Sequence, residues 1–243
     1  MTTGLWRERD FMKLWTGQAV SELGSVVTRT ALPIAAVLLL GATPLQMALL
    51  LTSASAAVLL FGLAAGAWID RLRRRPIMIA ADAVRAVALA SVPAAAFAGV
   101  LRIEQLYAVV FVEAALGAAF DAAYRSYLPS LVGRARLVDG NSKLEMASAV
   151  AEIGGPGLAG GLVQVITAPL ALLVDAFSFV VSAVSLALIR TPEPRVTPAA
   201  GRSSIGREIA GGLRFVWRER TLRAMTAGGV VNRFFGGFFV LYT

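Results

Sequence analysis

Cysteine and histidine are both absent from this chain of 243 residues. Without cysteine there can be no disulfide and no thiolate metal site. Without histidine, proton transfer near neutral pH would depend on carboxylates buried in an apolar interior. The sequence also lacks a Gly-x-x-x-x-Gly-Lys-Ser/Thr phosphate-binding loop, a nucleophile elbow and any cluster of metal ligands. We therefore expect neither an enzyme nor a nucleotide-driven machine, and no cofactor.

Charged residues are scarce as well, at 16% of the chain, whereas hydrophobic residues make up 57%. Soluble domains are about a quarter charged. A spanning helix needs about 20 apolar residues, so the chain has room for six or seven spans. A soluble helical bundle would need polar outer faces, which these segments lack. We predict an all-α membrane protein in contact with a lipid bilayer.

Six apolar segments are each long enough to cross a bilayer: residues 14–40, 45–69, 77–100, 106–128, 144–166 and 170–189. Together they predict a six-helix bundle over residues 14–189, preceded by a polar lead at residues 1–13. The connection at residues 133–143 is polar and basic, and we expect a loop there.

The remainder of the chain is expected to hold a linker and the start of another span. Residues 190–220 begin with a stretch that contains three prolines and continue with an amphipathic pattern, which predicts a cytoplasmic linker with a helix at the membrane surface. A seventh apolar segment begins near Thr221 and is still running at Thr243. We expect residues 221–243 to be the truncated start of a seventh transmembrane helix.

Basic residues predict the orientation of the bundle. Of the 23 lysines and arginines, 18 lie in the lead, in the connections after the second and fourth segments, and between Arg190 and Arg223. The opposite set of connections holds only Arg102. Basic loops stay in the cytoplasm, so the N-terminus is predicted to be cytoplasmic, with no signal peptide. The formal charge of +8 therefore indicates membrane topology rather than nucleic-acid binding.

The connection after the second segment carries a recognisable motif. It reads Gly-Ala-Trp-Ile-Asp-Arg-Leu-Arg-Arg-Arg-Pro over residues 66–76. The pattern Gly-x-x-x-Asp-Arg-x-x-Arg-Arg resembles the signature loop of the major facilitator superfamily, although that loop commonly has Gly where this chain has Arg73. Other stretches are similar to the bacterial drug and siderophore exporter branch that includes macrolide efflux proteins: Leu14–Gln18, Ala31–Pro33, Ala81–Arg85 and Gly155–Gly160.

This resemblance covers essentially the whole chain and implies the N-terminal half of a transporter built from two six-helix halves. It implies proton-coupled efflux of amphipathic small molecules across a bacterial inner membrane by alternating access. A facilitator-type importer is an alternative. A second alternative is a truncated fragment that transports nothing, or a half-transporter that must pair with a partner bundle. The implied partners are a small-molecule substrate and the missing C-terminal half, with no nucleic acid and no nucleotide.

The resemblance also implies a cytoplasmic gate in the signature loop. It assigns to that gate the loop residues Gly66, Asp70, Arg71, Arg74 and Arg75. A carboxylate at a helix N-terminus is favourable, which fits a latch that breaks when the gate opens. The alternative is that the arginines only anchor the topology. We expect Asp121 and Arg125, which lie four apart on one helix face, to belong to the same gate.

Charged residues inside the spans are candidates for the transport path, because a charge facing lipid is costly. Glu22, Arg29, Glu113 and Glu152 lie well inside their segments. The resemblance implies that the first and fourth spans line the path, so Arg29 and Glu113 are expected to pair, with Glu113 as the carboxylate that carries the proton. The alternative is a permanent structural ion pair.

Three further charged residues lie in the predicted spans. Asp82 and Arg85 are expected to lie close to the surface and to secure the third span, and Asp175 has no predicted role.

Small residues gather in the fifth segment. Gly154, Gly155, Pro156 and Gly160 are expected to allow close helix packing and to form a hinge. In the antiporter version of this motif two residues separate Gly-Pro from Gly-Gly, whereas three do so here. The motif alone therefore does not predict antiport.

Overall fold

The computed structural model describes residues 4–69 and 72–193 and, beyond them, residues 214, 217–219, 223–224 and 228. The predicted surface helix and seventh span lie almost entirely outside the described residues. Asp70 and Arg71 of the signature loop also lie outside them.

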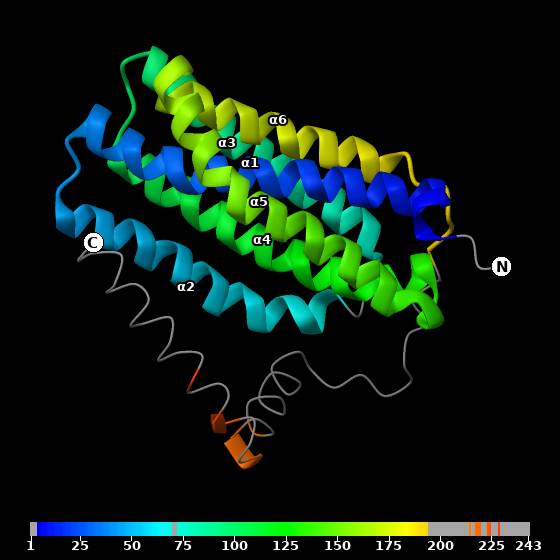
Figure 1. Ribbon diagram of the computed structural model, residues 1–243. Coiled ribbons are helices and arrows are strands. Elements are labelled where there is room, and N and C mark those ends of the chain that lie inside the picture. Colours follow the sequence, from blue (N-terminus) through cyan, green and yellow to red (C-terminus); the bar gives the residue numbers. More distant parts are fainter. Residues whose placement is uncertain are drawn as a thin grey trace. The chain divides into compact units, whose positions relative to one another are not determined.

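Six long helices make up the described bundle (Figure 1). They are α1 (Arg9–Leu40), α2 (Pro44–Ile69), α3 (Arg74–Phe97), α4 (Ile103–Val132), α5 (Leu137–Ile166) and α6 (Ala168–Ala187), with short 3₁₀ helices at η1 (Leu5–Arg7) and η2 (Arg134–Arg136). All six are long and apolar enough to cross a membrane. The predicted all-α membrane fold is confirmed.

The outer face of the bundle is apolar. Leu38, Val87 and Ile153 expose 73%, 72% and 85% of their surface. Such large exposed aliphatic side chains are unfavourable in water and favourable against lipid. The outward-facing surface is therefore suited to a bilayer.

The predicted loop at residues 133–143 is wrong over most of its length, because α5 already begins at Leu137. Gly140 is buried in this first part of α5, where a Cβ would be in ordinary contact with Leu5 at 3.6 Å and Phe11 at 3.8 Å. The polar residues of this segment form a helical turn that continues past the apolar run. Polarity alone does not mark a loop at a membrane surface.

The turn between α1 and α2 follows from its residues. Gly41 takes a φ of +61°, a left-handed conformation that ends a helix without steric cost. The side chain of Gln46 then accepts a hydrogen bond from the Thr43 N–H at 2.8 Å, and Thr43 Oγ1 accepts one from the Gln46 N–H at 3.4 Å. This reciprocal capping box starts α2.

The helices follow one another around the bundle in an order that differs from the chain. α1 packs against α5 and α6, α6 also packs against α3, α3 packs against α4, and α4 packs against α2. α1 and α4 make few direct contacts with each other. They therefore face one another across the interior.

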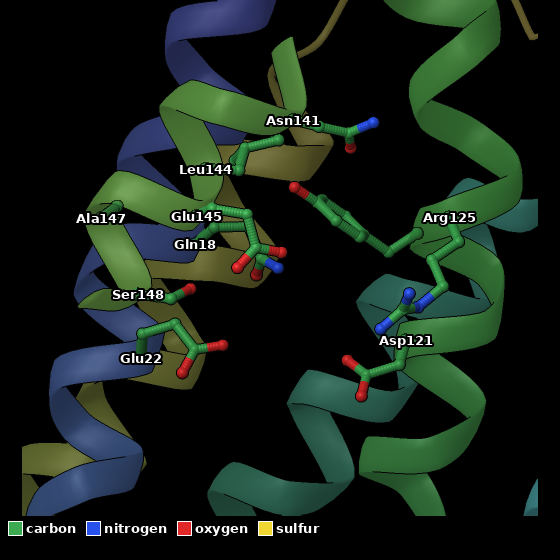
Figure 2. A pocket seen from close by; sticks show the side chains of 10 residues that line it. Gln18, Glu22, Asp121, Arg125, Asn141, Leu144, Glu145, Ala147 and Ser148 are labelled. Carbon is green, nitrogen blue, oxygen red and sulfur yellow. The ribbon is translucent and has the colours of Figure 1, made fainter. Parts of the chain in front are cut away.

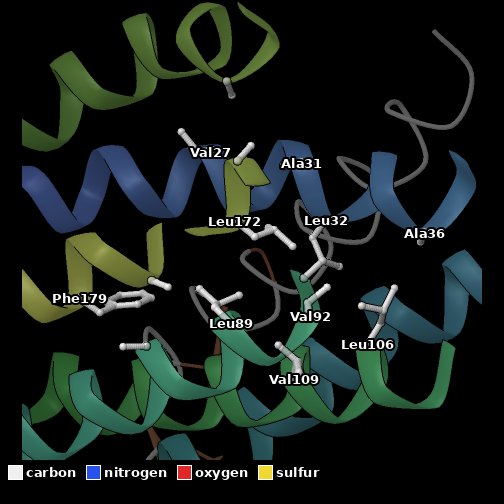
Figure 3. Packing of buried hydrophobic residues seen from close by; sticks show 14 of the residues in the cluster. Val27, Ala31, Leu32, Ala36, Leu89, Val92, Leu106, Val109, Leu172 and Phe179 are labelled. Carbon is white, nitrogen blue, oxygen red and sulfur yellow. The ribbon is translucent and has the colours of Figure 1, made fainter. Parts of the chain in front are cut away.

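Two apolar clusters fill the ends of this interior. The first lies at the basic end, which we define as the end where α1 begins and α2 ends, and it includes Leu14, Met78 and Tyr127. The second lies at the opposite end and includes Val27, Leu89 and Phe179 (Figure 3). Between them lies a layer with the buried polar side chains of Ser21, Asp82, Arg85 and Ser182, while Thr28, Asp175 and Ser178 are buried within the second cluster. We call this the polar layer.

Candidate transport site

Two adjoining cavities of about 190 and 220 Å³ open at the polar layer. They share Gln18, Glu22 and Asp121, and we treat them together as the polar cavity. Its charged and amide lining is Gln18, Glu22 and Arg29 from α1, Arg85 from α3, Glu113, Asp121 and Arg125 from α4, and Asn141 and Glu145 from α5. Figure 2 shows Asp121 and Arg125 facing Glu22 and Glu145 across the cavity.

The helical repeat explains why these residues meet. Gln18, Glu22, Ser25 and Arg29 recur every three or four residues, so they share one face of α1. Glu113, Gly117, Asp121 and Arg125 do the same on α4, and all eight line the polar cavity. Polar faces on two spanning helices avoid lipid only by turning toward one another.

Glu113 forms a salt bridge with Arg85, whose Nη2 lies 2.8 Å from Oε1 of Glu113. The guanidinium stacks on the ring of Phe179, 3.9 Å from its centroid. Gly117 lies beside the guanidinium, where a Cβ would be in ordinary contact at 3.8 Å from Nη2. The pair ties α3 to α4 in the middle of the bundle.

This arrangement corrects two expectations. Arg29 lines the same cavity, but in the part of the chain that the structure describes Glu113 bridges to Arg85 and not to Arg29. Asp82 and Arg85 are not near the surface, because they are only 0% and 8% exposed. Asp82 and Arg85 are buried because other helices of the bundle pack against α3, which their position along the sequence does not reveal.

The loop residues that begin α3 have a clear structural function. The carboxylate of Glu193 accepts hydrogen bonds from the backbone N–H groups of Arg74, at 2.6 Å, and Arg75, at 3.4 Å. The side chain of Arg75 donates to the carbonyls of Leu186, at 2.8 Å, and Ala187 at the end of α6. An anion thus caps the N-terminus of α3 and a cation caps the C-terminus of α6, both favourable for the helix dipoles.

A second set of polar contacts at the basic end was not predicted from the sequence. One oxygen of Asp10 accepts bonds from the N–H and the hydroxyl of Thr191, at 2.8 and 2.7 Å. Lys13 donates to the other oxygen and to the carbonyl of Leu188, both at 2.7 Å. The i, i+3 spacing of Asp10 and Lys13 was the available signal, but nothing in it indicates residues about 180 positions away.

The predicted site residues on α5 have different surroundings. Glu152 is exposed on α5 and lines neither cavity, although Ser148, one turn earlier, does. Gly155 packs tightly, because a Cβ there would come 2.5 Å from Val26 of α1. No described atom lies within 4 Å of the Cβ position at Gly154 or Gly160.

Two more of the predicted positions lie within helices. α5 continues through Pro156. Gly66 lies in α2, near its end at Ile69.

Asp175, which had no predicted role, is fully buried between α6 and α1. Its Oδ1 accepts a hydrogen bond from the Ser178 hydroxyl at 2.9 Å. Gly24 of α1 makes room for both, since a Cβ there would overlap Ser178 and Asp175. The pairing of a glycine with a buried carboxyl gives α1 and α6 a close, polar contact.

Comparison with known proteins agrees with this architecture. The chain matches the model of the Major Facilitator Superfamily over residues 14–243. It is 27% identical over 226 residues to macrolide efflux protein A of Streptococcus pyogenes, covering 92% of this chain and 55% of that protein. It is 33% identical over 175 residues to the multidrug efflux pump Tap of Mycolicibacterium fortuitum, covering 67% of this chain and 41% of the pump.

A third relative is the MFS-type transporter YfiS of Bacillus subtilis, which is 28% identical over 179 residues, or 74% of this chain and 42% of that protein. The chain thus spans about half the length of the curated relatives it matches. Six spanning helices around a charged cavity, together with a family match that covers most of the sequence, establish that this chain belongs to the Major Facilitator Superfamily.

Proposed function

We propose that this chain forms the first of two six-helix bundles of a bacterial inner-membrane transporter, which exports amphipathic small molecules in exchange for protons. The observation that carries the proposal is the polar cavity, with the Arg85–Glu113 pair in its wall. Ionisable groups held inside a membrane-spanning bundle are costly and are typical of substrate and proton pathways. Two relatives with efflux in their names support the direction of transport.

The cavity lining favours a substrate with a positive charge and an apolar body. Four carboxylates line the polar cavity, those of Glu22, Glu113, Asp121 and Glu145, against the three guanidiniums of Arg29, Arg85 and Arg125. Figure 2 shows the part of the lining in which Glu22, Asp121 and Glu145 lie around Arg125. The aromatic ring of Tyr124 lies beside them and could contact a cation through its face. Glu113 is the proposed proton carrier, since it both lines the cavity and has a switchable partner in Arg85.

The basic end is proposed to face the cytoplasm and to hold the gate. The distribution of basic residues supports this orientation. Arg75 and Glu193 already join α3 to the end of α6 there, and Asp70 and Arg71 are proposed to form the latch with the second bundle. Asp121 and Arg125 line the cavity and are proposed to open with the gate.

A second candidate is a half-transporter that works only with a partner bundle. Glu152 and Gly154 are exposed on α5, close to the cavity, where a second bundle would cover them. Small residues let membrane helices approach closely, so this part of α5 is suited to contact with another helix.

Efflux of a fluorescent amphipathic cation from cells tests both candidates. Cells would express the chain, its Glu113→Gln variant, or a matched control, Glu104→Gln, which changes an exposed carboxylate in the first turn of α4, outside the cavity. Dye clearance that a protonophore or Glu113→Gln stops, but Glu104→Gln does not, would support proton-coupled export. Dye retention equal to that of empty cells, with folded chain in the membrane, would refute transport by this chain alone.

In that second case the assay would be repeated with a six-helix second half co-expressed. Recovered clearance would support the half-transporter. Dye that moves inward down its gradient and ignores the protonophore would instead support a facilitator.

A further inference from the structure

Asp82 is a buried carboxyl group that plays no part in the proposed transport path. It lies on α3, is 0% exposed, and neither of its oxygens has a hydrogen-bond partner among the described residues. The Ser182 hydroxyl approaches from α6 without reaching hydrogen-bonding geometry. A carboxylate ion in this position would lack the hydrogen bonds that a buried charge requires.

Arg85 stands between Asp82 and the polar cavity. Its Nη1 lies 3.8 Å from Asp82 Oδ1, while its Nη2 lies 2.8 Å from Glu113 Oε1. The guanidinium is only 8% exposed and rests on the flat face of Phe179, across which it can shift without losing that contact. One cation therefore serves two carboxyl groups, one that lines the cavity and one that does not.

The other charged groups near this cluster come from every neighbouring helix. They are Glu113 and Asp121 on α4, Glu22 and Arg29 on α1, and Asp175 on α6. Among the described residues, only Arg85 comes within 4 Å of an Asp82 oxygen with opposite charge. Asp82 and Glu113 thus compete mainly for Arg85.

We propose that Asp82 is a second proton-binding site, and that Arg85 moves between Glu113 and Asp82 as the proton is exchanged. In the arrangement seen here, Arg85 bonds the Glu113 carboxylate and the proton is on Asp82. In the other arrangement the O–H bond of Asp82 has broken, a proton has bound to a Glu113 oxygen, and Arg85 bonds the Asp82 carboxylate. Arg85 keeps all its protons, and the three groups together carry no net charge in either arrangement.

This inference rests on the proposed function. Within that function, the movement of Arg85 would couple binding in the cavity to the packing of the helices. A cationic substrate that binds Glu113 would displace Arg85 just as a proton does, and Asp82 would then release its proton. One cation would thus be exchanged for one proton. The same movement would break the tie between α3 and α4 and replace it with an ion pair within α3.

Infrared spectroscopy can test the proposal without any transport. The chain would be labelled with ¹³C-carboxyl aspartate and purified in lipid nanodiscs, so that the protonated aspartates give a shifted acid carbonyl band. The part of this band that Asp82→Asn removes belongs to Asp82. Glu113→Gln removes the charge that holds Arg85 in the cavity, so we expect the same part of the band to disappear in that variant, although no aspartate has been changed.

The controls make each outcome decisive. Glu104→Gln should leave the band unchanged, and in an Arg85→Gln background Glu113→Gln should have no effect on it. If Asp82→Asn fails to fold, the switch is still tested by measuring whether Glu113→Gln lowers the acid carbonyl band of the labelled aspartates. An Asp82 that is ionised in the unmodified chain, or a band that Glu113→Gln does not alter, would overturn the proposal.

Dye efflux read in parallel separates this inference from the proposed function. Proton-dependent efflux with an unresponsive aspartate band would overturn the switch and leave the function standing. A responsive band in a chain that moves no dye, either alone or with a co-expressed second half, would leave the switch standing and overturn the proposed export.

Discussion

The contact between α5 and α1 at Gly155 allows a quantitative prediction. A Cβ at this position would lie 2.5 Å from Val26 Cγ1, 2.8 Å from its Cβ and 3.2 Å from its Cγ2. Valine in a helix has one strongly preferred rotamer, so Val26 cannot turn away. Gly155→Ala therefore forces the two helices apart.

Two effects determine the expected change in the free energy of unfolding of Gly155→Ala: crowding against Val26 and the helix propensity of alanine. Overpacking of a well-packed interior typically costs about 1–3 kcal/mol. Alanine is the better helix former by about 1 kcal/mol, which offsets part of this cost. Gly154→Ala gains the same helix propensity, and no described atom lies within 4 Å of the Cβ position at Gly154. This variant therefore serves as the control. We expect Gly155→Ala to be less stable than Gly154→Ala by about 1–3 kcal/mol.

One complication requires a second comparison. Gly155 precedes Pro156, and a residue with a Cβ before proline disfavours the helical conformation. A double-mutant cycle with Val26→Ala isolates the contact, because the proline effect is present in both backgrounds. Removing both Val26 methyl groups should recover about 1–2 kcal/mol of the loss, within the range measured for contacting residues.

The assay is reversible unfolding of the purified chain in mixed micelles, followed by its helical circular dichroism. Equal stabilities for Gly155→Ala and Gly154→Ala, or a coupling energy near zero with Val26→Ala, would refute the argument. Either result would mean that α1 and α5 do not pack through this glycine.

Three further predictions concern stability and can be measured by the same unfolding assay. Glu193→Ala removes the cap of α3 and should cost about 1 kcal/mol, whereas a Glu104→Ala control should cost less than half of that. Arg75→Ala removes the bonds to the carbonyls of Leu186 and Ala187 and should cost about 1–2 kcal/mol; an unchanged midpoint would show that these carbonyls are satisfied otherwise. Tyr127→Phe should be neutral or stabilising by up to about 1 kcal/mol, because the buried hydroxyl has no partner among the described residues, and a clear loss of stability would indicate a partner.

The helices themselves could be predicted because a membrane restricts the possibilities. Each apolar segment had to become a helix, since lipid satisfies no backbone group. The ends were less predictable: α3 begins at Arg74 and α5 at Leu137, before their apolar runs. Glu193 caps α3, and Gly140 of α5 lies beside Leu5; both contacts join segments that are far apart in the sequence.

The cavity was predictable in part. The family resemblance implied that spans one and four line a common path, and Glu22, Arg29 and Glu113 all line the polar cavity. The partner of Glu113 was not predictable, because it depends on α3 being next to α4 in the bundle. Arg85 is the twelfth residue of α3, about 17 Å along it, which places it as deep as Glu113.

The two apolar clusters explain why the charged groups can be retained at all. Each cluster joins α1, α3, α4 and α6 at one end, and so the helices stay together even though the layer between the clusters contains Asp82 and Arg85. Stability thus comes from the ends, and the polar layer is not required to supply it. A rearrangement of charge in this layer, such as the movement of Arg85, therefore changes the contacts of α3 while the clusters keep the bundle folded.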